Sequence, residues 1–363
     1  MKRGTVLIMA GGTGGHIFPA LAAARVLRER GFEPVWLGTQ RGLEAKLVPP
    51  QQIEIEWISV SGLRGKGIGT WFAAPFKLSL ALWQSLKVMR RRRPAVVLGA
   101  GGFVSGPGGL AAWLTRRPLV IHEQNAVAGM TNRMLACFAR SVLEAFPASF
   151  PPHAKAQRVG NPVRREIAAI APPAQRFAER SGRLRVLIFG GSQGAARLNA
   201  VVPAAFAMID AAERPAIIHQ AGERHLDVAR EMYAKHGVQA DVRAFIDDMA
   251  EAYAWADLVI CRAGALTVSE IAAAGLGAVF VPFAAAVDDH QTRNAKFLVD
   301  AEAAVLIPEA ELTPLRLYEV LRGLLTAGRE KLADMAARAR TLAITDADVR
   351  LADACIDAAG GAR

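Results

Sequence analysis

The sequence predicts an α/β protein of two domains, each built on a parallel β-sheet. A short apolar strand enters a glycine-rich turn and then a helical pattern from residue 6 onward, and the same succession returns from residue 186. Further apolar runs alternate with helical stretches in both halves, which is typical of parallel sheets covered by helices. A length of 363 residues also suits two domains, at roughly 150 residues each.

Each expected strand is a run of apolar residues bounded by turn formers. After the opening strand of each half, further strands are expected at 34–38, 95–99, 118–122 and 141–146, and then at 215–220, 257–261 and 277–282. Helical patterns follow the two glycine turns, at 17–30 and 196–209. Because 160–182 holds three prolines and no clear strand, we place the domain boundary there, with domains at 1–162 and 163–344.

Positive charge is concentrated in the first half of the chain. The net charge is +11, yet residues 1–160 hold 21 Lys and Arg against 7 Glu and no Asp, so that part carries +14 and the rest −3. This favours an anionic partner for the first domain. Nucleic-acid binding is disfavoured because the basic stretch has no RNA-recognition or zinc-finger signature. Three widely spaced cysteines argue against a disulfide framework, and we expect neither a signal peptide nor a membrane-spanning segment.

The two glycine turns are candidate phosphate sites, because a helix amino terminus offers unpaired N–H groups and partial positive charge. The first turn does not fit the dinucleotide pattern GxGxxG, and strand 34–38 does not end in an acidic residue, which argues against an NAD-dependent oxidoreductase. GxxxxGK[ST] is also absent, which argues against a kinase or ATPase. Either turn could instead serve only tight packing.

Polar residues also follow two other strands. Glu270 lies in the second turn of a helix that follows strand 257–261, where a carboxylate can accept both hydroxyls of a ribose; the alternative is a solvated helix glutamate. Four consecutive polar residues, 122–125, follow strand 118–121.

Seven motifs stand in order along the chain: GGTGGHIFPA (11–20), GAGGFVSGPGG (99–109), HEQN (122–125), GNPVR (160–164), GGSQGA (190–195), RAGALTVSE (262–270) and DDHQTRNA (288–295). Together they closely resemble the MurG family. That family transfers N-acetylglucosamine from UDP-N-acetylglucosamine (UDP-GlcNAc) to undecaprenyl-pyrophosphoryl-MurNAc-pentapeptide (lipid I), which yields lipid II for peptidoglycan. The resemblance implies the GT-B fold, two Rossmann-like domains facing a cleft, and a final helix near 345–359 that places residues 345–363 with the first domain.

The resemblance also implies the substrate contacts. Arg164 and Ser192 would lie at the diphosphate, Glu270 at the ribose, and Gln291, with His290 as a weaker candidate, at the sugar. The backbone of Ile246 would meet the uracil. The remaining donor contacts would be Thr13, Gly14, Gly15, Asn125, Ala265, Leu266, Thr267, Val268 and Ser269. The acceptor would contact Gly102, Phe103, Ser105 and Gly106.

Catalysis by the family is expected to invert the sugar by direct displacement. We expect His16 to accept the proton of the acceptor hydroxyl, because an imidazole of pKa about 6.5 can do so at neutral pH. Glu123 is the second candidate, and His16 could instead cap its helix or bind an acceptor phosphate. The helix dipole behind 190–195 and Arg164 would stabilise the leaving diphosphate. We expect no cofactor and no metal, since Asp346 and Asp348 stand where a helix begins.

Residues 68–93 combine apolar bulk with a basic end. Phe72, Phe76 and Trp83 recur at helical spacing, Trp71 is adjacent, and Arg90, Arg91, Arg92 and Arg93 follow. The alternative is an ordinary core helix with a solvated end. A lipid-linked acceptor favours contact with an anionic membrane surface, hence a peripheral protein on the cytoplasmic face of the plasma membrane, with cell-wall and division proteins as further partners. A UDP-GlcNAc 2-epimerase is the nearest rival function.

Overall fold

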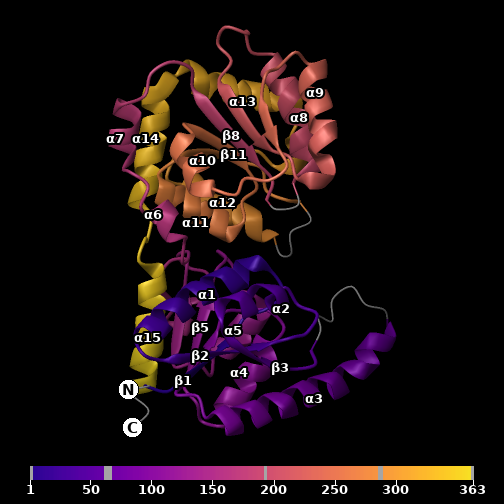
Figure 1. The fold of residues 1–363 in the computed structure, drawn as a ribbon, viewed down its shortest axis with the longest axis vertical. Helices are drawn as coiled ribbons and strands as arrows, with labels where there is room; N and C mark the ends of the chain where they lie inside the picture. The colour runs from indigo at the N-terminus through magenta and orange to yellow at the C-terminus, as the bar shows by residue number, and fades with distance from the viewer. Residues whose placement is uncertain (1–2, 61–67, 192–193, 285–288, 361–363) are drawn as a thin grey trace. The chain divides into compact units, whose positions relative to one another are not determined.

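A computed structural model describes residues 3–60, 68–191, 194–284 and 289–360. For residues 68–74 it describes the backbone alone. The chain divides into two compact units: unit 1 comprises Met1–Val163 and Ile344–Arg363, and unit 2 comprises Arg164–Ala343. The division falls one residue from the boundary expected after 162. Each unit is an α/β structure around one parallel sheet (Figure 1).

Within the described residues, the sheet of unit 1 has seven parallel strands in the order β3-β2-β1-β4-β5-β6-β7. The strands are β1 (Thr5–Met9), β2 (Glu33–Gly38), β3 (Glu54–Trp57), β4 (Val96–Gly99), β5 (Leu119–Glu123), β6 (Ser141–Glu144) and β7 (Gln157–Arg158). The helices are α1 (Gly14–Glu29), α2 (Glu44–Leu47), α3 (Ile68–Arg92), α4 (Ser105–Leu114), α5 (Met130–Ala136) and α15 (Ala347–Gly360).

Alternate residues of β1 explain why helices cover both faces of this sheet. Val6 and Ile8 are buried with residues of α1 and α15. Leu7 and Met9 point to the opposite face and are buried with residues of α3, α4 and α5. Because successive side chains of a strand point to opposite faces, an unbroken apolar strand is buried on both sides.

The last helix belongs to unit 1 although it is far from the rest of that unit in sequence. Helix α15 packs against α1, and its Leu351 and Cys355 are fully buried. Asp348 forms an ion pair with Arg25 at 3.3 Å. The two carboxylates that stand at DxD spacing are thus placed at a helix start, as expected.

Unit 2 repeats the architecture with six parallel strands among its described residues, in the order β10-β9-β8-β11-β12-β13. They are β8 (Arg185–Phe189), β9 (Ala216–Gln220), β10 (Asp241–Arg243), β11 (Leu258–Cys261), β12 (Gly277–Phe280) and β13 (Ala304–Leu306). The helices are α6 (Arg165–Ala168), α7 (Pro173–Ala178), α8 (Ala196–Ala207), α9 (Leu226–Lys235), α10 (Met249–Trp255), α11 (Ala265–Ala274), α12 (His290–Val299), α13 (Pro314–Thr326) and α14 (Gly328–Thr341).

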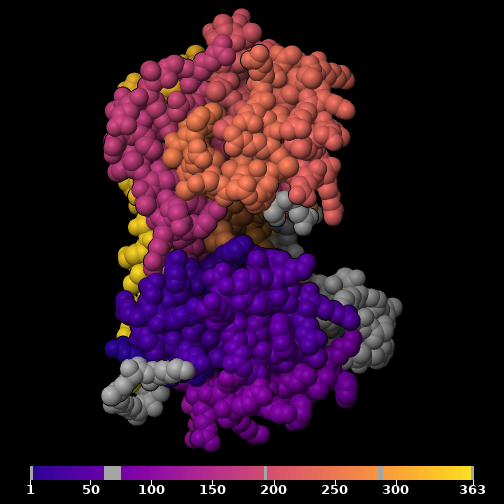
Figure 2. All heavy atoms as spheres, viewed as in Figure 1, coloured from indigo at the N-terminus to yellow at the C-terminus, as the bar shows by residue number. Residues whose placement is uncertain are grey.

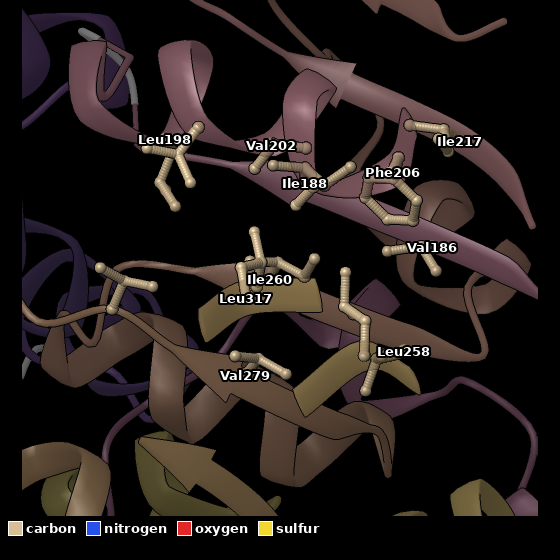
Figure 3. Packing of buried hydrophobic residues seen from close by; sticks show 14 of the residues in the cluster. Val186, Ile188, Leu198, Val202, Phe206, Ile217, Leu258, Ile260, Val279 and Leu317 are labelled. Carbon is tan, nitrogen blue, oxygen red and sulfur yellow. The ribbon is translucent and has the colours of Figure 1, made fainter. Parts of the chain in front are cut away.

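Figure 3 shows one layer of the core of unit 2. Leu198, Val202 and Phe206 project from α8 toward the sheet, where they meet Ile188 of β8. Leu317 of α13 joins the same cluster. The spacing of the three α8 residues is the i, i+4 pattern that forms one apolar helix face.

Both sheets change winding direction at the strand that precedes a glycine turn. β1 pairs with β2 on one side and β4 on the other, and β8 likewise pairs with β9 and β11. Ligands of such folds bind at the carboxyl ends of strands beside this switch point. Each glycine turn therefore occupies the position where a ligand is expected in its own unit.

Four strands of the structure were not predicted from the sequence: β3, β7, β10 and β13. All four lie at sheet edges. Helix α1 begins at Gly14, three residues before the expected start at 17. Pro75 does not break α3, which runs from Ile68 through Arg92. Among the described residues, the structure contains no helix both long and apolar enough to span a bilayer.

Candidate functional site

In unit 1, two glycine segments pack directly against each other after β1 and β4. Gly102 has φ +85°, and a Cβ there would overlap the carbonyl oxygen of Gly11. Gly101 has φ +101°, and its Cβ would lie 2.8 Å from Nδ1 of His16. Only glycine permits both the backbone conformation and the close approach. One N–H of the first turn is already used, because that of Gly12 donates to buried Glu44 at 3.4 Å.

His16 stands in the first turn of α1 and is joined to a buried polar chain. Its Nδ1 lies 2.8 Å from Oε1 of Gln124. Nε2 of Gln124 lies 3.0 Å from Nδ1 of His122, and Nε2 of His122 lies 2.9 Å from the carbonyl oxygen of Gly160. His122 is fully buried, and burial lowers its pKa to about 4. The polar run 122–125 thus contacts His16 through Gln124. The sequence alone did not predict this contact.

Glu123 is the centre of a different set of hydrogen bonds. Its Oε1 accepts from the backbone N–H and the side-chain amide of Asn125, at 3.0 and 3.1 Å. Its Oε2 accepts from the N–H of Gly129 and the amide of Asn132, at 3.1 and 2.9 Å. With 2% of its surface exposed, this carboxylate joins the 124–129 loop to the first turn of α5.

The segment 102–106, which is expected to contact the acceptor, is only partly exposed. Ser105 is fully buried, and its hydroxyl lies within hydrogen-bond distance of the carbonyl oxygens of Met9 and Gly101. The Ser105 hydroxyl is therefore engaged inside the protein, and the expected contact of Ser105 with the acceptor stays a prediction that only its backbone could meet. Phe103 is exposed, and Gly102 and Gly106 are half-buried.

In unit 2, the second glycine turn lies between β8 and α8. A Cβ on Gly194, whose φ is +75°, would overlap the carbonyl oxygen of Ala221. Gln220, at the end of β9, donates to the carbonyl of Gly191 at 3.0 Å. Ser192 lies outside the described residues. The turn is thus held against the end of the neighbouring strand.

Glu270 projects from α11 toward two partners. Its Oε1 accepts from Nε and Nη2 of Arg164, both at 3.0 Å. Its Oε2 accepts from the hydroxyl of Tyr253 at 3.3 Å. Burial raises the pKa of Glu270, and the hydrogen bonds from Arg164 and Tyr253 oppose that rise. Tyr253, on α10, was not predicted, since an aromatic residue in a helix gives no sequence signal for such a contact.

The rest of α11 faces several ways. Val268 is fully buried, so its side chain belongs to the core, and its expected contact with the donor stays a prediction that only its backbone could meet. Ala265 is buried, and the Ser269 hydroxyl donates to its carbonyl at 3.0 Å. Leu266 and Thr267 are half-buried. A helix buries one face, so a contiguous motif cannot present every residue to a ligand.

Gln291 and Ile246 complete the described part of this half-site. Oε1 of Gln291 accepts from the N–H groups of Ala263 and Phe283, at 3.2 and 2.9 Å. Its amide nitrogen is not used in either of these two contacts. Ile246 is buried, which suits a contact through its backbone. Among the described residues, no three His, Cys, Asp or Glu side chains gather in a metal-binding group.

Helix α3 carries an exposed face at the surface of unit 1, in purple along its lower edge in Figure 2. Phe76 and Trp83 are 76% and 60% exposed, and Arg90 lies further along the same face. The side chains of Trp71 and Phe72 lie outside the described residues. Arg90, Arg91 and Arg93 are exposed and Arg92 is half-buried, and Arg91 and Arg92 both pair with Glu56 on β3. Half of the arginine run is therefore compensated inside the unit.

Comparison with known proteins agrees with this architecture. The N-terminal and C-terminal domain models of glycosyltransferase family 28 match residues 6–144 and 185–351. Two relatives, from Nitrosococcus oceani and Marinobacter nauticus, are 56% and 55% identical, and each alignment covers 98% of this chain, and 99% and 98% of the relative. Both are named UDP-N-acetylglucosamine–N-acetylmuramyl-(pentapeptide) pyrophosphoryl-undecaprenol N-acetylglucosamine transferase.

A solved structure shows the same fold. The crystal structure of Acinetobacter baumannii MurG is 41% identical, with a TM-score of 0.88, and covers 98% of this chain and 99% of its own. The fold is therefore GT-B, as expected, with two Rossmann-like units. From these matches and the two glycine turns at their switch points, the chain belongs to the MurG family of N-acetylglucosaminyltransferases within glycosyltransferase family 28.

Proposed function

We propose that this chain transfers N-acetylglucosamine from UDP-GlcNAc to lipid I, forming lipid II and releasing UDP. The observation that carries the proposal is the match over 98% of the chain to relatives named for this transfer. The two half-sites described above give the reaction its chemistry, with donor binding assigned to unit 2 and proton transfer to unit 1.

In this proposal the carboxylate of Glu270 accepts the ribose hydroxyls of the donor. Gln291 donates its amide N–H to the sugar, because its oxygen is already engaged by two backbone N–H groups. Arg164 and the amino terminus of α8 stabilise the diphosphate as negative charge grows on it. Thr13, Gly14, Gly15, Asn125, Ser192, Ile246, Ala265, Leu266, Thr267 and Ser269 remain proposed donor contacts through backbone or side chain.

The chemical step is a single displacement that inverts the sugar carbon. The acceptor hydroxyl oxygen bonds to C1 while the bond from C1 to the diphosphate oxygen breaks, and UDP departs with the electron pair. His16 takes the proton of the hydroxyl on Nε2. Glu123 holds the adjacent loop through its four hydrogen bonds. Phe103, which is exposed, is proposed to contact the acceptor together with Gly102 and Gly106.

The lipid acceptor requires access to a membrane, and the exposed face of α3 is suited to it. Phe76 and Trp83 supply apolar surface, and Lys87, whose ammonium lies 5.7 Å from the Trp83 ring centre, begins the cationic end. Each cation near an anionic leaflet contributes about 1 kcal/mol. We infer peripheral attachment to the cytoplasmic face of the plasma membrane through this helix. Proteins of cell-wall synthesis and division are proposed as further partners.

The test is UDP release with and without lipid I. Release that depends on lipid I supports the transfer, whereas conversion of UDP-GlcNAc to UDP-ManNAc without acceptor would establish an epimerase instead. The His16→Ala variant should lower kcat by roughly 10² to 10⁴, with His153→Ala, an exposed histidine of the same unit, as the matched control. Near-normal turnover of His16→Ala would contradict the assignment of the base.

A further inference from the structure

We propose that Gln124 and His122 are positioning residues that hold His16 in the tautomer with its proton on Nδ1, which leaves the lone pair of Nε2 free to accept a proton. The inference rests on the proposed function, in which His16 is the base. It assigns roles to two side chains that touch neither the sugar nor the diphosphate in that proposal.

The direction of the hydrogen-bond chain is fixed at its far end. A backbone carbonyl can only accept, so Nε2 of His122 must donate to the Gly160 oxygen 2.9 Å away. In neutral His122, Nδ1 is then an acceptor, and it requires a donor from Gln124 at 3.0 Å. The amide must therefore present its nitrogen to His122 and its oxygen to His16. That oxygen can only accept, so Nδ1 of His16, 2.8 Å away, carries the proton.

The hydrogen bonds that join His122, Gln124 and His16 keep these donors and acceptors only while His122 stays neutral. A charged imidazole would donate from both nitrogens and would turn the amide of Gln124 around. Burial, with a smaller contribution from His16, lowers the pKa of His122 to about 4, although the hydrogen bond to the Gly160 carbonyl and the nearby Glu123 carboxylate oppose this shift. His122 is thus uncharged near neutral pH. The amide nitrogen of Gln124 also lies 3.2 Å from the carbonyl oxygen of His122, a second contact that only this orientation of the amide satisfies.

The groups of the chain are packed so that they cannot easily reorient. His122 is fully buried and Gln124 is 1% exposed. The side chain of Asn161 donates to the backbone oxygen of Gln124 at 2.9 Å. Gly101 lies so close to the His16 ring that a Cβ would be 2.8 Å from Nδ1. His16 itself is only partly buried. The hydrogen bond to Gln124, rather than burial, therefore selects its tautomer.

The tautomer can be measured without catalysis. Long-range ¹H–¹⁵N correlation spectra of the full chain labelled with ¹⁵N-histidine distinguish a protonated ring nitrogen from one with a lone pair. The His16 signals are assigned by their loss in His16→Ala. The wild type, measured at about pH 8, should show Nδ1 of His16 protonated and Nε2 unprotonated. In Gln124→Met, which keeps the length of the side chain but removes its three hydrogen bonds to His16 and His122, the two tautomers should mix.

The kinetic readout separates positioning from folding. Gln124→Met should lower kcat by roughly 10- to 100-fold, as removal of a residue that orients a catalytic imidazole does, while KM for UDP-GlcNAc stays within twofold. The double variant His16→Ala/Gln124→Met should be no slower than His16→Ala, because Gln124 acts through His16. Gln51→Met, at an exposed glutamine of the same unit, should match the wild type in both measurements.

A wild-type spectrum with the proton of His16 on Nε2 would overturn the proposed positioning of His16 by Gln124 and His122, the relay. This test holds even if Gln124→Met does not fold. An unchanged tautomer in folded Gln124→Met would overturn it as well. These failures leave the proposed function intact. Normal turnover of His16→Ala has the opposite meaning: it removes His16 as the base, and the relay then has no catalytic role whatever its tautomer.

Discussion

Replacement of Glu270 by Gln is the sharpest test of the donor half-site. The carboxylate has two oxygens, one facing Arg164 and one facing Tyr253. A carboxylate can accept from both hydroxyls of a ribose, whereas an amide has a single accepting oxygen. Glu270→Gln keeps the size and shape of the side chain, so the packing of α11 is retained while one ribose hydrogen bond is lost.

The expected loss follows from that count. A hydrogen bond to a charged group contributes about 1.5–3 kcal/mol, which is roughly a 10- to 150-fold weaker affinity for UDP. Loss of the ion pair with Arg164 in Glu270→Gln should raise the affinity for UDP, because in the free protein Arg164 competes with the nucleotide for the same carboxylate. The Arg164 side chain is 48% exposed, and such a pair is worth at most about 1 kcal/mol. The lost ribose contact therefore dominates.

Isothermal titration calorimetry with UDP and with 2′-deoxy-UDP measures the effect directly. The wild type should prefer UDP, and the preference should shrink in Glu270→Gln. Glu231→Gln, at an exposed glutamate on α9 of the same unit, should retain both the affinity and the preference. A dissociation constant for UDP within twofold of the wild type, or an unaltered preference, would refute the ribose assignment.

Two further predictions concern the membrane and acid stability. Arg90→Gln/Arg93→Gln should weaken binding to anionic vesicles in a sedimentation assay more than Arg91→Gln/Arg92→Gln, because the second pair is compensated by Glu56; equal effects would contradict a membrane role for the exposed pair. Burial lowers the pKa of His219 to about 3, so the unfolded state binds a proton that the folded state does not. Hydrogen exchange of β9 should show the free energy of unfolding of unit 2 falling by about 1.4 kcal/mol per pH unit as the pH drops below about 6.5. The same pH dependence in His219→Gln would show that His219 is not its cause.

The interior of each sheet could be predicted from the sequence and its edges could not. β1 and β8 are runs of apolar residues because helices cover both of their faces. β3 instead alternates Glu54 and Glu56 with apolar residues, and β10 is three residues long with charge at both ends. Edge strands are commonly short and charged, which protects them from pairing with other chains. Their sequences therefore resemble loops.

At the site, motifs located the right segments and did not say which side chains face a ligand. Ser105 and Val268 lie within motifs, yet both are fully buried. The partners of Gln124 depend on Gly160, which the fold brings to His122 across 38 positions of sequence. Tyr253 reaches Glu270 from a separate helix. Local sequence gives the residue types at a strand end, but tertiary packing selects their hydrogen-bond partners.

The return of α15 to unit 1 has a consequence for how the protein is made. Because Leu351 and Cys355 complete the core beside α1, a nascent chain on the ribosome cannot finish its first unit until residues 347–360 have been synthesised. Unit 2, whose residues are contiguous, is complete earlier. A fragment that stops at residue 163 would expose to water the apolar face of β4 and β5 and the side of α1 that α15 covers, and it would aggregate unless the C-terminal helix were supplied as a separate peptide.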